Sequence, residues 1–235
     1  MSEALLEAVG LAVELGGRRV VDGVSLRANA GQVVAVVGPN GAGKTSLLRA
    51  LAGLVGSTGE LHVAGEDPRR AAAQANARRR AYCAQEPTCA WDYRVSDLGE
   101  IVGNPAGFAH WLTQLRLDGF AGRNLAGLSG GEQKAAQLAM AFASLGEPFG
   151  AVLLLDEPAA ALDLARQEAV RQAVLSFAHA GAACLLATHD LGHARDCDQV
   201  VVLDEGRMIA AGAPADALTP AIIAGTWGAT ASPAR

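Results

Sequence analysis

Aromatic residues are scarce in this 235-residue chain. They make up 4% of it, against 51% for all hydrophobic residues together. Much of the hydrophobic share is alanine, so the core volume per apolar residue is low. That share still excludes a disordered chain, and the length is enough to bury a core. We therefore expect one large domain, or a domain with a compact subdomain.

The chain also lacks an excess of basic residues, since its net charge is −5 and its pI is about 5.5. Duplex binding is dominated by neutralisation of phosphates, so nucleic acid is not an expected partner. The cysteines include no CxxC pair, which argues against a disulfide scaffold or a zinc ribbon. We expect all four to be packing residues: Cys83, Cys89, Cys184 and Cys197.

Long apolar runs are missing as well. The longest candidates, 33–37 and 151–155, fall far short of the ~18 residues that a membrane span requires. Acidic residues occupy the N-terminus, where a signal peptide needs basic ones. We therefore expect a cytosolic protein that reaches a membrane only through a partner. The short runs are typical of buried parallel strands.

The order of elements predicts an α/β fold. Two alternating stretches, 5–15 and 20–27, indicate a β-meander. Further along, buried strands alternate with helices, which predicts a mainly parallel sheet covered on both faces. Residues 86–128 are irregular and indicate short helices in a separate lobe. The basic stretch 69–80 indicates an exposed, solvated helix.

The first motif that carries chemistry lies between an apolar strand and a helix. It matches GxxxxGK[ST], whose glycines let backbone N–H groups surround phosphate oxygens. Its lysine reaches the β- and γ-phosphates, and its threonine hydroxyl can bind Mg²⁺. The predicted phosphate-binding residues are Gly38, Pro39, Asn40, Gly41, Ala42, Gly43, Lys44, Thr45 and Ser46.

Two carboxylates end the predicted strand over 151–155. Asp156 would help to hold Mg²⁺, the usual partner of a phosphate-loop threonine. Glu157 would orient or deprotonate a water that attacks the γ-phosphate. A strand ending in two acids is commonly a solvated turn, but the phosphate loop favours the functional interpretation.

A third motif, LSGGEQ, opens a long helix. Ser129 and Glu132 form a capping box, which explains both of them without any ligand. It does not explain Gly130 and Gly131, which cost helix stability. Paired glycines would let a nucleotide phosphate approach the helix N-terminus. Since the chain already has a phosphate loop, we expect this helix to serve the nucleotide of another protomer.

These motifs together resemble the ATP-binding cassette (ABC) ATPases over residues 5–213. GPNGAGKT resembles the Walker A loop, LSGGEQ the signature motif and AVLLLDEP the Walker B strand. Gln85 falls at the Q-loop, Asp163 in the D-loop and His189 at the switch histidine. The six elements occur in the family's order.

The resemblance implies one nucleotide-binding domain over 1–235. Its fold would be a P-loop NTPase with a RecA-like parallel-sheet core, an antiparallel β-subdomain and a small helical subdomain inserted at about 86–145. Two copies would stack head to tail around ATP and Mg²⁺, each site combining one chain's Walker A loop with the other's signature motif.

The resemblance also implies a role for each remaining position. Glu157, His189 and Gln85 would form the catalytic group, with Gln85 contacting Mg²⁺ and the attacking water. The metal would be held by Thr45, Gln85 and Asp156. Asp163 would cross the dimer interface.

Several positions depart from the family pattern. The aromatic residue that stacks on adenine is replaced by Leu15, and Arg18 or Arg19 could stack instead. Ala160 stands in the D-loop where Ser or Asn is common. Lys134 and Gln137 differ from the commoner residues after the signature.

Two stretches, 91–105 and 217–228, resemble the importer ATPases for iron–siderophore complexes, haem and cobalamin. That would make the chain a peripheral subunit at the cytoplasmic face of the membrane. It would bind a polytopic permease through Glu86–Ser96, and indirectly a substrate-binding protein. A soluble ATPase of iron–sulfur cluster assembly and the ATPase of a lipid or drug exporter remain alternatives. DNA-repair and ribosome-associated relatives are disfavoured by length and charge.

Overall fold

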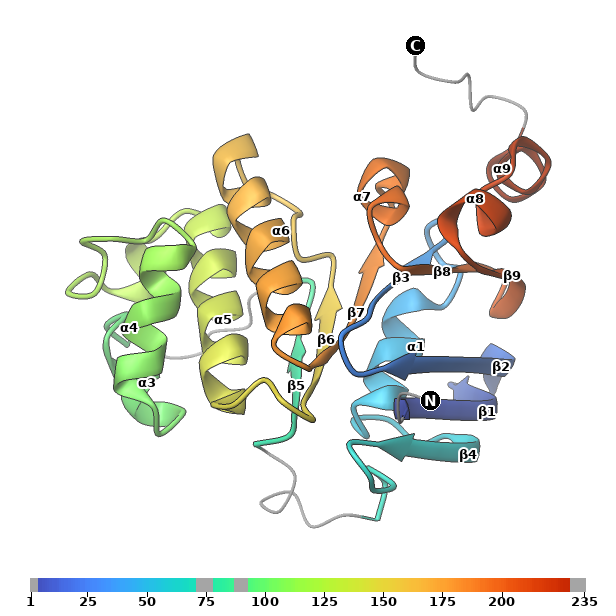
Figure 1. Ribbon diagram of the computed structural model, residues 1–235, viewed down its shortest axis with the longest axis horizontal. Coiled ribbons are helices and arrows are strands. Elements are labelled where there is room, and N and C mark those ends of the chain that lie inside the picture. Colours follow the sequence, from blue (N-terminus) through green and yellow to red (C-terminus); the bar gives the residue numbers. More distant parts are fainter. Residues whose placement is uncertain (1–3, 71–77, 87–92, 229–235) are drawn as a thin grey trace.

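The computed structural model describes residues 4–70, 78–86 and 93–228, which form two β-sheets and the helices around them (Figure 1). The smaller sheet is antiparallel in the order β2-β1-β4. Its strands are β1 (Ala4–Leu15), β2 (Arg18–Asn29) and β4 (Thr58–Val63). The β1–β2 turn is made by Gly16 and Gly17, whose φ angles of 57° and 75° suit glycine. The predicted meander is confirmed.

The larger sheet has the order β5-β6-β7-β3-β8-β9 and is parallel except for the final β8–β9 pair. The predicted, mainly parallel sheet is confirmed. Its central strands are buried on both faces, which explains why they are apolar throughout. The strands are β3 (Val33–Val37), β5 (Arg80–Cys83), β6 (Val152–Asp156), β7 (Ala183–Thr188), β8 (Gln199–Asp204) and β9 (Arg207–Gly212).

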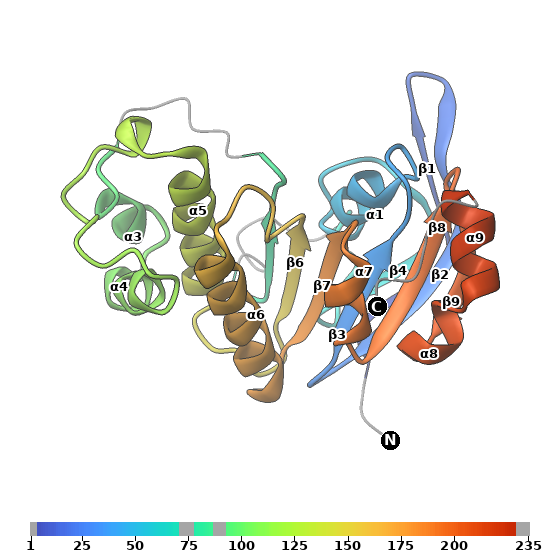
Figure 2. The ribbon, with the colours of Figure 1, turned by 90° about the horizontal axis from the view of Figure 1, so that it is seen from above.

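Helices cover both faces of this sheet (Figures 1 and 2). Helix α1 (Lys44–Leu51) lies between it and the antiparallel sheet. The opposite face carries α5 (Gly130–Leu145), α6 (Leu164–His179) and α7 (Leu191–Arg195). The helical lobe adds α3 (Asp97–Ile101), α4 (Pro105–Gln114) and the 3₁₀ turn η1 (Leu125–Gly127). Helices α8 (Pro214–Ala217) and α9 (Pro220–Trp227) follow β9.

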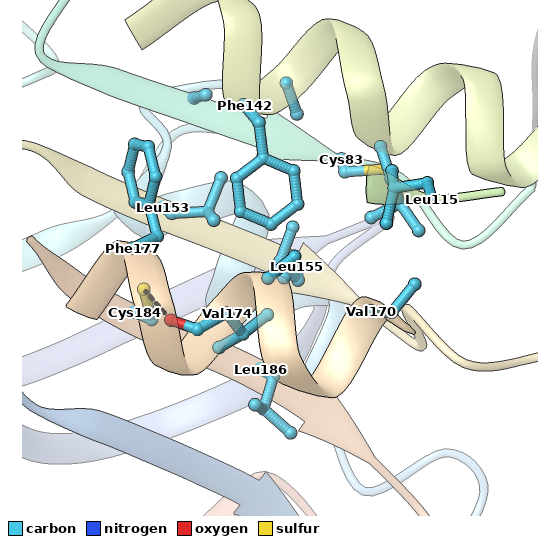
Figure 3. Packing of buried hydrophobic residues seen from close by; sticks show 14 of the residues in the cluster. Cys83, Leu115, Phe142, Leu153, Leu155, Val170, Val174, Phe177, Cys184 and Leu186 are labelled. Carbon is cyan, nitrogen blue, oxygen red and sulfur yellow. Dashed lines mark hydrogen bonds between the residues drawn. The ribbon is translucent and has the colours of Figure 1, made fainter. Parts of the chain in front are cut away.

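Two hydrophobic cores lie on the two faces of the parallel sheet. Along β3, Val33, Ala35 and Val37 face the helical side, and Val34 and Val36 face α1. This alternation is the two-residue period of a strand. On the helical side, rings fill the space between helices, as Figure 3 shows for Phe142 of α5 and Phe177 of α6.

The basic stretch is not one helix over 69–80. Arg69 and Arg70 lie in a turn, and Arg80 begins β5 by pairing with Val152; residues 71–77 lie outside the described residues. Arg69 is not simply solvated, because it donates to Asp67 and to the carbonyls of Ser57 and Gly59. Strand pairing and this ion pair override the helix-forming composition.

The cysteines are placed as packing residues. Cys83 and Cys184 are buried and Cys197 is partly buried, whereas Cys89 lies outside the described residues. Burial raises the pKa of the Cys83 thiol to about 11. Within the described part of the chain, no helix is long and apolar enough to cross a bilayer.

Candidate nucleotide site

The phosphate loop connects β3 to α1, where backbone segments crowd together. A Cβ atom at Gly38 would overlap the carbonyl of Leu203, and one at Gly43 would overlap the carbonyl of Val20. At Gly43 the φ of 98° also favours glycine. Glycine is therefore required at both positions for packing against β8 and β2, before any phosphate is considered. At Gly41 the space beyond the backbone is open.

Lys44 is the first residue of α1 and is only 8% exposed. Its Nζ donates to the carbonyl oxygens of Gly38 at 2.8 Å and Pro39 at 3.1 Å. Burial lowers the pKa of Lys44, and Glu157 and Asp156 oppose that shift. The ammonium thus lies over its own loop, where phosphate oxygens could replace the two carbonyls.

Asp156 ends β6 and is 1% exposed. Its Oδ2 accepts a hydrogen bond from the Tyr82 hydroxyl at 3.3 Å. Its Oδ1 is buried and has no hydrogen-bond partner among the described residues. Burial and then Asp156 raise the pKa of Tyr82. A buried carboxylate oxygen without a partner, facing the same cavity as Thr45, fits a hydrated divalent cation.

Glu157 and His189, predicted from separate motifs, are in direct contact. His189 Nδ1 lies 2.9 Å from Glu157 Oε2. Glu157 is 8% exposed and has φ of 47°, an unfavourable value for a non-glycine residue. Its N–H donates to the carbonyl of Ala187 on β7, which holds this conformation. The neighbouring strand therefore holds the backbone of Glu157 in this unfavourable conformation at the tip of β6.

A single cavity of about 650 Å³ gathers most of the predicted residues. It is lined by Val20, Asn40, Gly41, Ala42, Gly43, Lys44, Thr45, Ser46, Gln85, Asp156, Glu157 and His189. Gly38 and Pro39, which begin the loop, do not line the cavity, but their carbonyls accept hydrogen bonds from Lys44. Gln85 comes from the segment after β5, so three strand ends and one loop meet here.

The signature residues lie elsewhere on the same chain. Ser129 caps α5, its N–H donates to Glu132 at 2.8 Å, and the predicted capping box is confirmed. A Cβ at Gly131 would lie 2.6 Å from the carbonyl of Ala161, whereas at Gly130 it would meet nothing within 4 Å. Gly131 is thus explained by a close approach within this chain. Only Gly130 leaves the open space that we expected of both glycines.

Asp163 also lies outside the cavity. It caps α6, accepting from the N–H of Arg166 and pairing with its guanidinium at 2.8 Å. The hydrogen bond from the Arg166 backbone lowers the pKa of Asp163. Leu164, the next residue, is a large apolar side chain with 83% exposure. Ser129, Gly130 and Leu164, at the N-terminal ends of α5 and α6, thus do not line the cavity.

The position predicted to face adenine does not line the cavity. Leu15 is exposed and does not line the cavity, whereas Val20 does. Arg19 pairs with Glu14 and Asp22, so it is not free to stack on a base. The first aromatic residue of the sequence is Tyr82. The sequence did not predict Val20, because only the packing of β2 against the phosphate loop brings this residue to the cavity.

The predicted permease-facing segment is described only in part. Residues 87–92, including Trp91, lie outside the described residues. Tyr93 is 38% exposed, as expected, whereas Val95 is fully buried in the helical core.

Comparisons with known proteins identify the family of the chain. The family model described as ABC transporter matches residues 21–160. A hemin import ATP-binding protein of Streptomyces coelicolor is 38% identical over 94% of this chain and 82% of its own length. A cobalamin import ATP-binding protein of Halobacterium salinarum is also 38% identical, and the matched region covers 56% of that protein.

Solved structures show the same fold. An ATP-binding subunit of an ABC transporter superposes with a TM-score of 0.79 at 25% identity, covering 97% of this chain and 95% of that one. A putative metal-chelate type ABC transporter gives a TM-score of 0.77 at 22% identity, covering 95% and 88%. The predicted P-loop NTPase fold is confirmed. The chain belongs to the ABC transporter family and is an ABC-type ATPase domain.

Proposed function

We propose that this chain is the ATP-hydrolysing subunit of an importer, and that its substrate is an iron complex, haem or cobalamin. The observation that carries the ATPase assignment is the single cavity that joins the phosphate loop, Asp156 and the Glu157–His189 pair. The importer assignment is supported by the printed names of the relatives, which are hemin and cobalamin import proteins.

Each cavity residue has a role in this proposal. Loop N–H groups and Lys44 bind the phosphates, and the ammonium exchanges its two carbonyl partners for phosphate oxygens. Glu157 orients the attacking water and accepts its proton, while His189 holds the carboxylate and contacts the γ-phosphate. Because the chain forms no covalent bond to the phosphate, its contribution is positioning and charge stabilisation.

The cavity also suits Mg²⁺. Thr45, Gln85 and Asp156 would hold the ion through oxygen atoms, and Asp156 Oδ1 is the buried oxygen left without a partner among the described residues. When bound, the ion would neutralise charge on the β- and γ-phosphate oxygens.

A second copy of the chain would complete each site. Ser129, Gly130, Gly131, Glu132 and Asp163 lie outside this chain's own cavity. In the proposed head-to-tail dimer, the open N-terminus of α5 and the exposed Leu164 face the partner's nucleotide. The segment 86–96 would bind the permease at the cytoplasmic face of the membrane, with the substrate-binding protein acting indirectly.

The ATPase role is tested by Glu157→Gln. The amide keeps the side chain's shape but cannot accept the proton, so kcat should fall by about 100-fold or more. ATP affinity, measured by calorimetry, should stay close to wild type because the phosphate loop is intact. Glu147→Gln makes the same change at an exposed residue and should leave both quantities unchanged. Steady hydrolysis by Glu157→Gln would contradict the role of Glu157.

The importer role is tested by capturing the Glu157→Gln protein with ATP in mild detergent and identifying its partners by mass spectrometry. A stoichiometric polytopic membrane protein would support a transport subunit, and that protein's gene neighbours would narrow the substrate. Recovery of soluble cluster-assembly proteins alone would contradict it and favour the iron–sulfur alternative. A membrane partner that moves lipids or drugs outward would favour the exporter alternative.

A further inference from the structure

Lysine is nearly absent from this chain. Only Lys44 and Lys134 occur among its 19 lysine and arginine residues, and both are buried. Lys44 belongs to the phosphate loop. Lys134 is 2% exposed and lies on α5, four residues after Gly130. Every other basic side chain is an arginine, so the second buried lysine requires an explanation.

The ammonium of Lys134 joins three segments that are distant in sequence. Its Nζ donates to the backbone carbonyls of Ala84, Gln85 at 3.1 Å and Asp156 at 3.0 Å. An ammonium has three N–H donors, so all of them are used. Helix α5 is thereby bonded both to the segment after β5 and to the end of β6.

The shape of the site explains why the residue is a lysine. Three carbonyl oxygens converge on one point, which suits a compact ammonium with three donors around a single nitrogen. A guanidinium is planar and spreads its donors over a fork, so it would not satisfy three convergent oxygens. Burying a cation is costly, and burial lowers the pKa of Lys134. Neighbouring α5 positions on the buried side are apolar: Ala135, Ala136, Leu138 and Ala139.

Two of the three bonded carbonyls belong to residues that line the nucleotide cavity. The Gln85 and Asp156 side chains line it, and Glu157 is bonded to Asp156 along the chain. We propose that Lys134 is a positioning residue that holds Gln85 and the Asp156–Glu157 tip in the geometry for hydrolysis and ties both to the signature helix. This inference rests on the proposed ATPase function of the cavity.

The test compares Lys134→Gln and Lys134→Met with Gln137→Ala. Gln137 lies one turn further along α5 and contacts Cys83 of β5, so its variant perturbs the same helix and strand but leaves the three carbonyls bonded. Lys134→Gln retains two N–H donors and protects the fold, whereas Lys134→Met removes every donor. Thermal unfolding identifies any variant that does not fold.

We expect kcat of Lys134→Gln to fall by about 10-fold and that of Lys134→Met by about 100-fold, since small displacements of positioned groups have effects of this size. ATP affinity by calorimetry should stay within about 3-fold, because the phosphate loop is untouched. Hydrogen exchange at the backbone amides of residues 84–86, measured without nucleotide, should accelerate in both variants and not in Gln137→Ala.

Unchanged exchange at 84–86 in Lys134→Gln would overturn the proposal, as would a loss that appears only in KM. If wild-type protein binds but does not hydrolyse ATP, the proposed function fails, and the exchange measurement still decides whether Lys134 holds the segment. Partial recovery of kcat in Lys134→Arg, relative to Lys134→Met, would support a requirement for donors at this position.

Discussion

The two faces of the parallel sheet are packed in different ways. Toward α1 and the antiparallel sheet, the buried cluster consists of aliphatic residues, and Tyr82 is the only ring packed against it among the described residues. Toward the helical lobe, Phe108, Phe142 and Phe177 are buried and Trp111 packs against them. The buried cluster on the helical side thus contains aromatic rings among its aliphatic residues, whereas the cluster on the phosphate-loop side is aliphatic.

This difference follows from what each face must join. On the phosphate-loop side, strands and loop approach so closely that Gly38 and Gly43 cannot carry a Cβ atom. On the helical side, α4, α5 and α6 are separated by side chains. Trp111 stacks on Phe142 at 4.4 Å, and Phe142 meets Phe177 edge to face at 5.3 Å. Among the described residues, the cluster on the other face has no such ring–ring contact.

The largest effect should come from Phe142→Ala, compared with Leu47→Ala on the opposite face. Both residues are fully buried. We expect Phe142→Ala to lower the free energy of unfolding by about 4 kcal/mol and Leu47→Ala by about 3 kcal/mol. ATP affinity should be retained in Phe142→Ala, because Phe142 does not line the cavity. Urea unfolding measures the loss of stability, and calorimetry measures the ATP affinity. A larger loss of stability in Leu47→Ala than in Phe142→Ala would contradict the expected difference between the two faces.

The next effect contrasts two glycines. Gly43→Ala places a Cβ against the Val20 carbonyl at a φ of 98°, so it should cost about 2–3 kcal/mol and abolish ATP binding. Gly130→Ala meets nothing within 4 Å in the first turn of α5, so stability should be unchanged or rise by up to about 1 kcal/mol. Thermal melts of the two variants test whether the close backbone approach at Gly43 has no counterpart at Gly130.

The smallest effect concerns a polar contact on each face. On the antiparallel side, Arg69 lowers the pKa of Asp67 to about 2 from 3.8. Its contribution is present above about pH 4 and is lost as the pH falls toward 2, because only the unfolded chain gains the proton in that range. Asp67→Asn should therefore cost about 1 kcal/mol at pH 7, and less near pH 3.

The contact on the helical side is neutral. Asn104 caps α4 and donates to the carbonyl of Ala143. Asn104→Ala should cost about 1 kcal/mol equally at both pH values. Urea unfolding at pH 7 and pH 3 compares the two variants, with Asp216→Asn as an exposed control. If Asp67→Asn lowered the free energy of unfolding equally at both pH values, the ion pair with Arg69 would not be the cause.

Some parts of the site could be predicted from the sequence because they depend on short sequence patterns. The phosphate loop lies between a strand and a helix within twenty residues, and Ser129 and Glu132 are one helical turn apart. The expected helix over 69–80 was wrong for the opposite reason. Its alanine and arginine content favours a helix, but Arg80 is held in β5 by pairing with Val152, more than seventy residues away.

Other features could not be found from local patterns. The site includes three residues that are distant along the chain from the groups they meet there. Tyr82 and Lys134 donate hydrogen bonds to Asp156, and Val20 lines the cavity beside the phosphate loop. Lys134 stood out only as a departure from a family pattern, and its three carbonyl partners became visible in the fold. Similarly, Gly131 looked like an opening for a ligand, yet the Ala161 carbonyl occupies that space.

Apart from the helix expected over 69–80, the sequence alone determined the main order of strands and helices. It also determined the phosphate loop and the acids at the end of β6, because periodicity, turn residues and short motifs act over a few residues. The tertiary structure decided which of these meet. Strand order brought His189 to Glu157 and Gln85 to the cavity, and the packing of α5 placed a buried ammonium between Gln85 and Asp156. Such contacts depend on the burial and convergence of distant backbone segments, which no local pattern encodes.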